Sequence, residues 1–66
     1  MTYYVNGKEI EIKKDLTVEQ ILLLEGFQLK QIAVEYNGNI LPKLQYSNQL
    51  IKANDKLEVV SFVGGG

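Results

Sequence analysis

The 66-residue sequence contains no cysteine, no histidine and no tryptophan. Without cysteine the fold has neither disulfide bonds nor thiolate metal ligands, so its stability must come from its apolar core. Histidine is the commonest general base and metal ligand in proteins, and cysteine is the strongest side-chain nucleophile. These absences argue against an enzyme with an active site of its own.

Arginine is absent too, and all seven basic residues are lysines, set against eight acidic residues. The formal net charge is −1, so the chain offers neither a basic field nor the guanidinium groups that recognise phosphates and bases. The sequence shows no secretory signal at its start and no apolar run long enough to cross a bilayer. We therefore expect no nucleic-acid partner, no membrane association and a cytoplasmic location.

The start of the sequence predicts a β-hairpin. Asn6-Gly7 separates the apolar run Tyr3–Val5 from the alternating run Lys8–Ile12, and Asn-Gly accepts both positive φ angles of a type I′ turn. Within the second run, Ile10 and Ile12 alternate with glutamates, so they should face the core.

One short helix of about two turns is predicted after the hairpin. Thr17 and Gln20 have the spacing of a capping box at a helix start. Gly26 is well placed as the residue that ends the helix, and Phe27 should then fold back on Leu22.

The second half of the sequence predicts strands and turns. Ile32–Tyr36 reads as a strand, Asn37-Gly38 as a tight turn, and Asn39–Leu41 as a short strand that Pro42 ends. Lys43–Ala53 is an irregular or single-turn segment, in which we expect four apolar anchors: Leu44, Tyr46, Leu50 and Ile51.

The last strand is predicted at Lys56–Val63, and it should pair in parallel with the first strand through a right-handed crossover. This order of elements predicts an α+β fold of the β-grasp, ubiquitin-like type. We expect a mixed sheet of four to five strands with one main helix packed on it, formed by residues 1–63 and followed by a tail of residues 64–66.

Alternation along the last strand places Val60 and Phe62 on the face opposite its other apolar residues. If the odd-numbered residues face the core, Phe62 is an exposed aromatic side chain that could anchor a partner, with Val60 beside it. Tyr36 and Ile40 would extend this docking surface if their strand pairs nearby. The alternative is that local twist buries Phe62.

The acidic residues form two pairs, Glu9 with Glu11 and Asp55 with Glu58. Strand alternation and turn placement predict that all four are surface groups. Without histidine, cysteine or a clustered third ligand, they are weak candidates for a metal site or for acid–base catalysis.

Three glycines, Gly64–Gly66, close the sequence. A glycine arm without Cβ atoms allows close approach by an enzyme, and it would present the Gly66 carboxylate to an active site. The competing interpretation is that the glycines are a frayed chain end or residues left over from an expression vector.

The whole pattern resembles the small sulfur-carrier proteins of thiamine biosynthesis, the ThiS-like β-grasp proteins. The resemblance rests on features spread along the whole chain: Asn6 at its turn, Leu16-Thr17-Val18 entering the helix, Ala33 to Leu41 with Pro42 behind it, Tyr46, Asn54–Leu57, and Phe62-Val63-Gly64-Gly65-Gly66. The family requires a terminal Gly-Gly, which Gly65 and Gly66 match.

This resemblance implies a carrier on which partner enzymes act. An E1-like adenylyltransferase would use ATP and Mg²⁺ to convert the Gly66 carboxylate into an acyl-adenylate. Sulfur from a persulfide, such as that of a cysteine desulfurase, would replace AMP and leave a thiocarboxylate on Gly66, with Gly64 and Gly65 as the flexible arm. Thiazole synthase would then take the sulfur, so the protein is a cosubstrate that binds no cofactor of its own.

Two other functions stay open from the sequence. A carrier of the same fold could serve another pathway, as the small subunit of molybdopterin synthase or a ubiquitin-like tag does. Alternatively, the chain could be a noncatalytic β-grasp binding module whose glycines are incidental.

Overall fold

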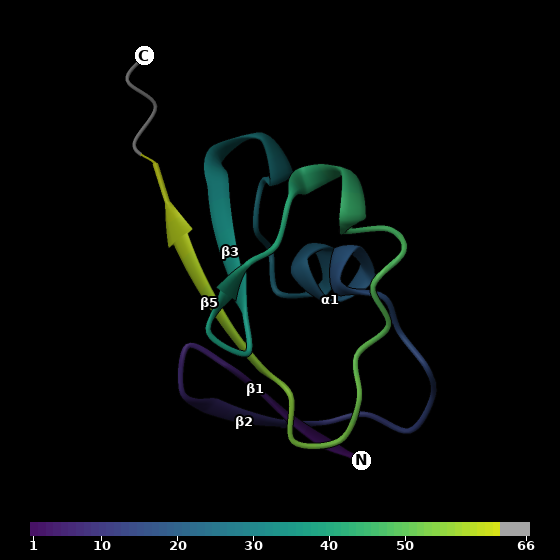
Figure 1. Ribbon diagram of the computed structural model, residues 1–66. Helices are drawn as coiled ribbons and strands as arrows, with labels where there is room; N and C mark the ends of the chain where they lie inside the picture. The colour runs from purple at the N-terminus through teal and green to yellow at the C-terminus, as the bar shows by residue number, and fades with distance from the viewer. Residues whose placement is uncertain (63–66) are drawn as a thin grey trace.

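The computed structural model describes residues 1–62. These residues form a five-stranded mixed sheet with the strand order β2-β1-β5-β3-β4, and α1 covers one of its faces (Figure 1). The strands are β1 (Thr2–Val5), β2 (Lys8–Glu11), β3 (Ile32–Tyr36), β4 (Asn39–Ile40) and β5 (Lys56–Ser61). The helix α1 is Val18–Leu24, and two 3₁₀ turns are η1 (Leu29–Gln31) and η2 (Lys43–Gln45). The predicted β-grasp architecture is therefore confirmed.

The predicted hairpin forms between β1 and β2, which pair antiparallel around Asn6 and Gly7. Both turn residues have positive φ angles, 50° at Asn6 and 80° at Gly7, as the Asn-Gly sequence predicts. Ile10 and Ile12 are partly buried against the core, so their predicted orientation is confirmed.

The helix α1 begins and ends with the predicted caps. Thr17 Oγ1 accepts a hydrogen bond from the Gln20 N–H (3.2 Å), and Gln20 Oε1 accepts one from the Thr17 N–H (2.8 Å). At the other end, the Phe27 N–H donates to the Leu22 carbonyl at 3.0 Å, and Gly26 has a φ of 88°. These contacts satisfy backbone groups that a helix end otherwise leaves without partners.

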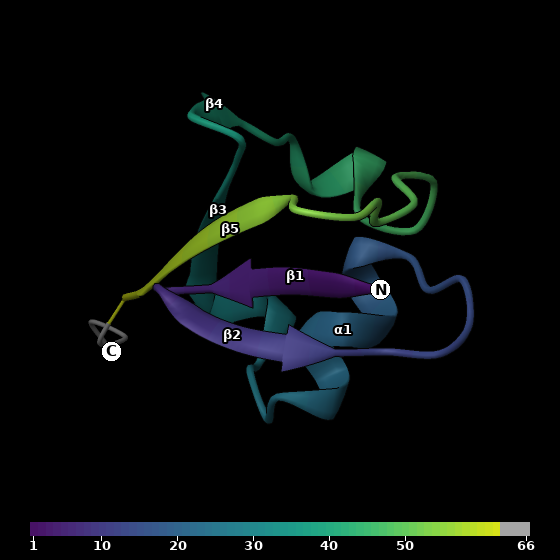
Figure 2. The ribbon, with the colours of Figure 1, turned by 90° about the horizontal axis from the view of Figure 1, so that it is seen from below.

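The strand β5 occupies the centre of the sheet, parallel to β1 and antiparallel to β3. Figure 2 shows β1 and β5 side by side, running in the same direction on one side of α1. The Asn6 side chain prolongs this pairing beyond the end of β1, because its Oδ1 accepts from the Val59 N–H at 2.6 Å and its Nδ2 donates to the Val59 carbonyl at 3.2 Å. The hairpin turn thus holds the middle of β5 in place.

The core lies between the sheet and α1. Its fully buried large side chains come from the sheet and the helix together: Tyr3, Val18, Ile21, Leu22, Val34 and Leu57. From the segment after β4, Tyr46 and Ile51 are buried as predicted. The predictions for Leu44 and Leu50 are wrong, since both are exposed, Leu44 at 88%. The 3₁₀ turn η2 directs Leu44 outward while it brings Tyr46 into the core.

Candidate functional site

The two predicted docking residues, Val60 near the end of β5 and Phe62 just after it, lie on the solvent side of the sheet. Leu57 and Val59 are buried against the helix, whereas Val60 and Phe62 are 61% and 53% exposed. The Phe62 N–H still donates to the Gln31 carbonyl at 2.7 Å, which fixes the backbone up to this residue. The predicted orientation is confirmed, and docking at these residues stays a prediction.

Beside Val60, the solvent-facing side of the sheet is hollowed into a groove, which we call the outer groove. Its volume is about 310 Å³. The groove is lined by residues of β3, β4 and β5: Ala33, Val34, Glu35, Ile40, Glu58 and Val60. Ile40 is 78% exposed, so it extends the exposed apolar surface of Val60 as the sequence suggested.

The expectation that Tyr36 extends this surface is wrong. Tyr36 is the register partner of Leu57, and residues directly opposite each other in a sheet lie on the same face, here the buried one. Its ring is partly buried against the core, and its hydroxyl donates to Asp55 Oδ2 at 2.6 Å. Tyr36 therefore faces the core side, away from Val60.

Asp55 was expected at the surface, and this prediction is also wrong, because the residue is only 7% exposed. Its carboxylate accepts hydrogen bonds from the Tyr36 hydroxyl, from Asn37 Nδ2 (3.1 Å) and from the Lys52 N–H (2.7 Å). Burial of a carboxylate costs little free energy when hydrogen-bond donors from nearby turns surround it.

The pKa values of this pair reflect the same contacts. Burial alone would raise the pKa of Asp55, but the hydrogen bonds from Tyr36, Asn37 and Lys52 outweigh it and hold the pKa below its ordinary value. Burial and the hydrogen bond to the Asp55 carboxylate raise the pKa of Tyr36 to about 12. Both residues therefore keep their ordinary charge states at neutral pH, which suits a structural role.

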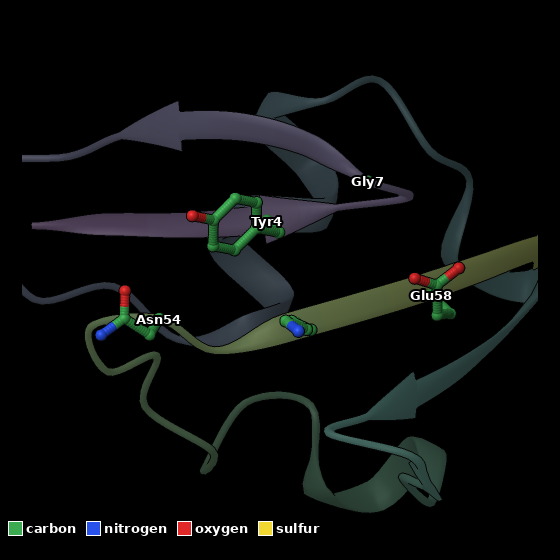
Figure 3. Close-up of a pocket in the computed structure, with 5 residues that line it drawn as sticks. Tyr4, Gly7, Asn54 and Glu58 are labelled. Carbon is green, nitrogen blue, oxygen red and sulfur yellow. The ribbon is translucent and has the colours of Figure 1, made fainter.

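A second hollow, of about 670 Å³, lies on the outer side of the sheet between β1 and β5. Tyr4, Lys56 and Glu58 line it together with Gly7 and Asn54. Figure 3 shows the Tyr4 ring on β1 and the Glu58 carboxylate on β5, on either side of this hollow. Glu58 thus borders both depressions of the outer face.

The part of the chain that the structure describes has no group of three side chains suited to hold a metal ion. Nor does a helix within residues 1–62 have the length and apolar character needed to cross a bilayer. The predicted sulfur-bearing Gly66, and the arm residues Gly64 and Gly65, lie outside the described residues.

Sequence reasoning missed the outer groove as a unit. The sequence alone gives no reason to place Ala33 or Glu35 in a docking surface, and it presents Glu58 only as one of two nearby acidic residues. Alternation within Ile32–Tyr36 and Lys56–Val63 does predict that these residues face outward. The register that brings Glu35 opposite Glu58 could not be read from either strand alone.

The fold and the exposed end of β5 define the class of protein, a small β-grasp protein of the ubiquitin-like type. Within that class the chain belongs to the ThiS family, whose family model matches residues 3–66. The match includes the three glycines.

Individual relatives agree with this assignment. The sulfur carrier protein ThiS of Bacillus subtilis is 36% identical over 63 residues, which cover 94% of this chain and 96% of that protein. The crystal structure of the thiamine biosynthesis protein ThiS from Geobacter metallireducens superimposes with a TM-score of 0.81, at 32% identity and with both chains fully covered.

A longer relative matches as well. A thiazole synthase of Paramagnetospirillum magneticum is 39% identical over 66 residues, which are all of this chain but only 20% of that protein. The chain therefore spans one fifth of the length of this relative.

Proposed function

We propose that this protein carries sulfur as a thiocarboxylate on Gly66 and donates it for the formation of a thiazole ring in thiamine biosynthesis. The observation that carries the proposal is the match to the ThiS family, which extends through Gly66. The relative named as a sulfur carrier, matched over nearly its whole length, supports the carrier role. The relative named as a thiazole synthase supports the thiazole as the destination of the sulfur.

The chemistry requires partner enzymes. A carboxylate is a poor electrophile, so an E1-like adenylyltransferase first joins the Gly66 carboxylate to the AMP portion of ATP and releases pyrophosphate. Sulfur then forms a bond to the carbonyl carbon, and AMP leaves. Mg²⁺ and cationic groups stabilise the charges that develop on the phosphates, and in this proposal the adenylyltransferase supplies them.

The route of the sulfur completes the proposal. A persulfide, such as that of a cysteine desulfurase, supplies the sulfur: its outer sulfur bonds to the carbonyl carbon as AMP leaves, which gives an acyl disulfide. A second thiol then cleaves the S–S bond, is itself oxidised to a disulfide, and leaves the thiocarboxylate on Gly66. Thiazole synthase receives the sulfur. The protein is then a cosubstrate of these enzymes in the cytoplasm, with Gly64 and Gly65 as the arm that leads to Gly66.

The docking role of Val60 and Phe62 belongs to the same proposal. Gly66 lies four positions after Phe62, and a fully extended chain spans no more than about 14 Å over four positions. An enzyme that holds Gly66 in its active site must therefore lie close to the end of β5. The exposed Phe62 side chain and its neighbour Val60 are the apolar groups available there.

Intact-mass spectrometry tests the proposal directly. The protein is incubated with ATP, Mg²⁺, sulfide and the adenylyltransferase of a ThiS pathway, beside a variant that lacks Gly65 and Gly66. We expect a mass gain equal to the replacement of one oxygen by sulfur, in the full chain only. With an active enzyme, the absence of any adenylate or sulfur adduct would refute the proposal and favour a noncatalytic binding module.

The recipient is tested in a second step. Addition of thiazole synthase with its small-molecule substrates should discharge the thiocarboxylate and return the original mass. A thiocarboxylate that this enzyme does not consume would instead indicate a carrier for another pathway, such as that of molybdopterin synthase.

A further inference from the structure

The outer groove exposes apolar surface that the fold itself does not use. Ile40 and Val60 are 78% and 61% exposed, and with Ala33 they line the hollow of about 310 Å³. The core lies on the opposite side of the sheet, against α1 (Figure 1). Adjacent exposed apolar side chains in a concave surface are typical of an interaction site.

The same groove contains two carboxylates that face each other. Glu35 on β3 is the register partner of Glu58 on β5, and directly opposed residues have Cβ atoms about 4.5–5.5 Å apart. Both side chains are exposed, and among residues 1–62 the salt bridge that forms joins the Met1 amino group to Glu11 instead. Like charges directly opposite each other destabilise a sheet, so this arrangement does not serve the stability of the fold.

Apolar walls and paired carboxylates together match one kind of side chain. Lysine and arginine have long aliphatic stems that pack on apolar surface while the cationic head stays at a polar edge. An arginine guanidinium can donate to two carboxylates at once because it has five N–H donors in a planar array. The groove is therefore complementary to a basic side chain, and to arginine best.

The position of the groove indicates which partner provides that side chain. Val60 lies six residues before Gly66, so the groove is next to any enzyme that engages Gly66. An enzyme that binds ATP and a carboxylate together needs a positive potential around its active site. The acidic pair would be attracted to that potential.

We propose that the outer groove receives an arginine or lysine side chain of the adenylyltransferase that activates Gly66, and that Glu35 and Glu58 hold its cationic head. This inference rests on the proposed function, because it assumes that such an enzyme acts on Gly66.

The test compares two variants that lose the same number of charges. Glu35→Gln with Glu58→Gln removes the pair in the groove, and Asp15→Asn with Glu25→Gln removes two exposed carboxylates outside the sheet. Adenylation is followed by pyrophosphate release with the ThiS-pathway adenylyltransferase. We expect the groove variant to raise KM about tenfold or more, the factor that hydrogen bonds to charged groups provide, with kcat nearly unchanged. The control variant should keep the wild-type KM.

Ionic strength gives a second readout, because salt screens exposed charges. The wild-type kcat/KM should fall as salt is added, and that of the groove variant should fall much less. A purely structural role of the two glutamates would not change this dependence.

Thermal unfolding shows whether the substitutions of the groove variant affect the stability of the fold or only the binding of the enzyme. Removal of the like-charge contact should leave the melting temperature of the groove variant equal to or above that of the wild type. Ile40→Ser changes the apolar wall without altering charge, and it should raise KM as well.

The outcomes also separate this inference from the proposed function. If the wild type is adenylated and the groove variant has the same KM and salt dependence, the inference is overturned while the proposed function stands. If the wild type is never adenylated by an active enzyme, the proposed function itself fails. A groove variant with normal adenylation but impaired sulfur transfer to thiazole synthase would also overturn the inference, since the groove would then serve the other enzyme.

Discussion

Asp55 shows how one buried charge can organise several loops. Its carboxylate joins Tyr36 at the end of β3, Asn37 in the following turn and the backbone of Lys52. Asn37 Oδ1 also accepts from the Lys56 N–H at 2.8 Å, which ties the same turn to the start of β5. These contacts fix the β3–β4 turn against the loop that leads into β5.

Asp55→Asn should destabilise the fold by about 1–3 kcal/mol at neutral pH, because one donor loses its acceptor inside the protein. Urea unfolding of the variant and the wild type measures this difference. A loss below the error of the measurement would show that Asp55 is not needed for the loop contacts.

Acid should remove part of the stability that Asp55 provides. The folded-state pKa of Asp55 is lowered, so its contribution is complete above the unfolded pKa of about 3.9 and is lost as the pH falls through the lower folded value. Asp55→Asn should therefore lose less stability between about pH 5 and pH 3 than the wild type does. Equal acid sensitivity of the two proteins would contradict this assignment.

Phe62 is a residue whose side chain should matter for partners and little for folding. Because it is 53% exposed, Phe62→Ser should change the free energy of unfolding by no more than about 0.5 kcal/mol. The same variant should be adenylated less efficiently if Phe62 contacts the enzyme. Leu44→Ser is a suitable control, because Leu44 is still more exposed and belongs to η2; it should be adenylated normally.

At the level of elements, the structure agrees best with the sequence where the signal is local. The Asn6-Gly7 turn, the capping box of Thr17 and Gln20, and the helix end at Gly26 each depend on residues within a few positions of one another. All of them form as predicted. The predicted parallel pairing of the last strand with the first is confirmed as well.

Predictions failed where distant residues decide the outcome. Asp55 is buried because Tyr36 and Asn37, 19 and 18 positions away, donate to it. Leu44 is exposed because the direction of η2, rather than the apolar character of the residue, determines which side chain reaches the core. The outer groove depends on the register of β3 with β5, which neither strand encodes by itself.

The capping box provides a prediction for α1. Thr17→Ala removes the side-chain acceptor of the Gln20 N–H, and it should cost about 1 kcal/mol, within the usual range of about 0.5–2 for such caps. Thr17→Ser retains the hydroxyl and should cost much less. Thermal unfolding of the three proteins measures the difference; equal losses for alanine and serine would show that the hydroxyl is not responsible.

For the molecule as a whole, small size limits stability. A chain of 66 residues is expected to unfold with a free energy of about 3–10 kcal/mol. The burial of one central core residue contributes a large part of that free energy.

Leu57→Ala illustrates this limit. Leu57 is 0% exposed and lies in the central strand, where truncation of a leucine costs about 2–5 kcal/mol. We expect the variant to be partly or wholly unfolded at 37 °C, as measured by circular dichroism. Val60→Ala, on the exposed side of the same strand, should remain folded.

The parallel pairing of β1 with β5 also determines how the protein responds to mechanical force. Because the two strands run in the same direction, a pull applied at Thr2 and Phe62 slides them past each other lengthwise. The hydrogen bonds of Tyr4 to Asp55, just before β5, and of Asn6 to β5 would then bear the force together rather than one after another. In single-molecule pulling, this direction should require more force than pulling the β1–β2 hairpin open from its free ends. An enzyme that draws on the end of β5 would thus meet a strand that resists extraction.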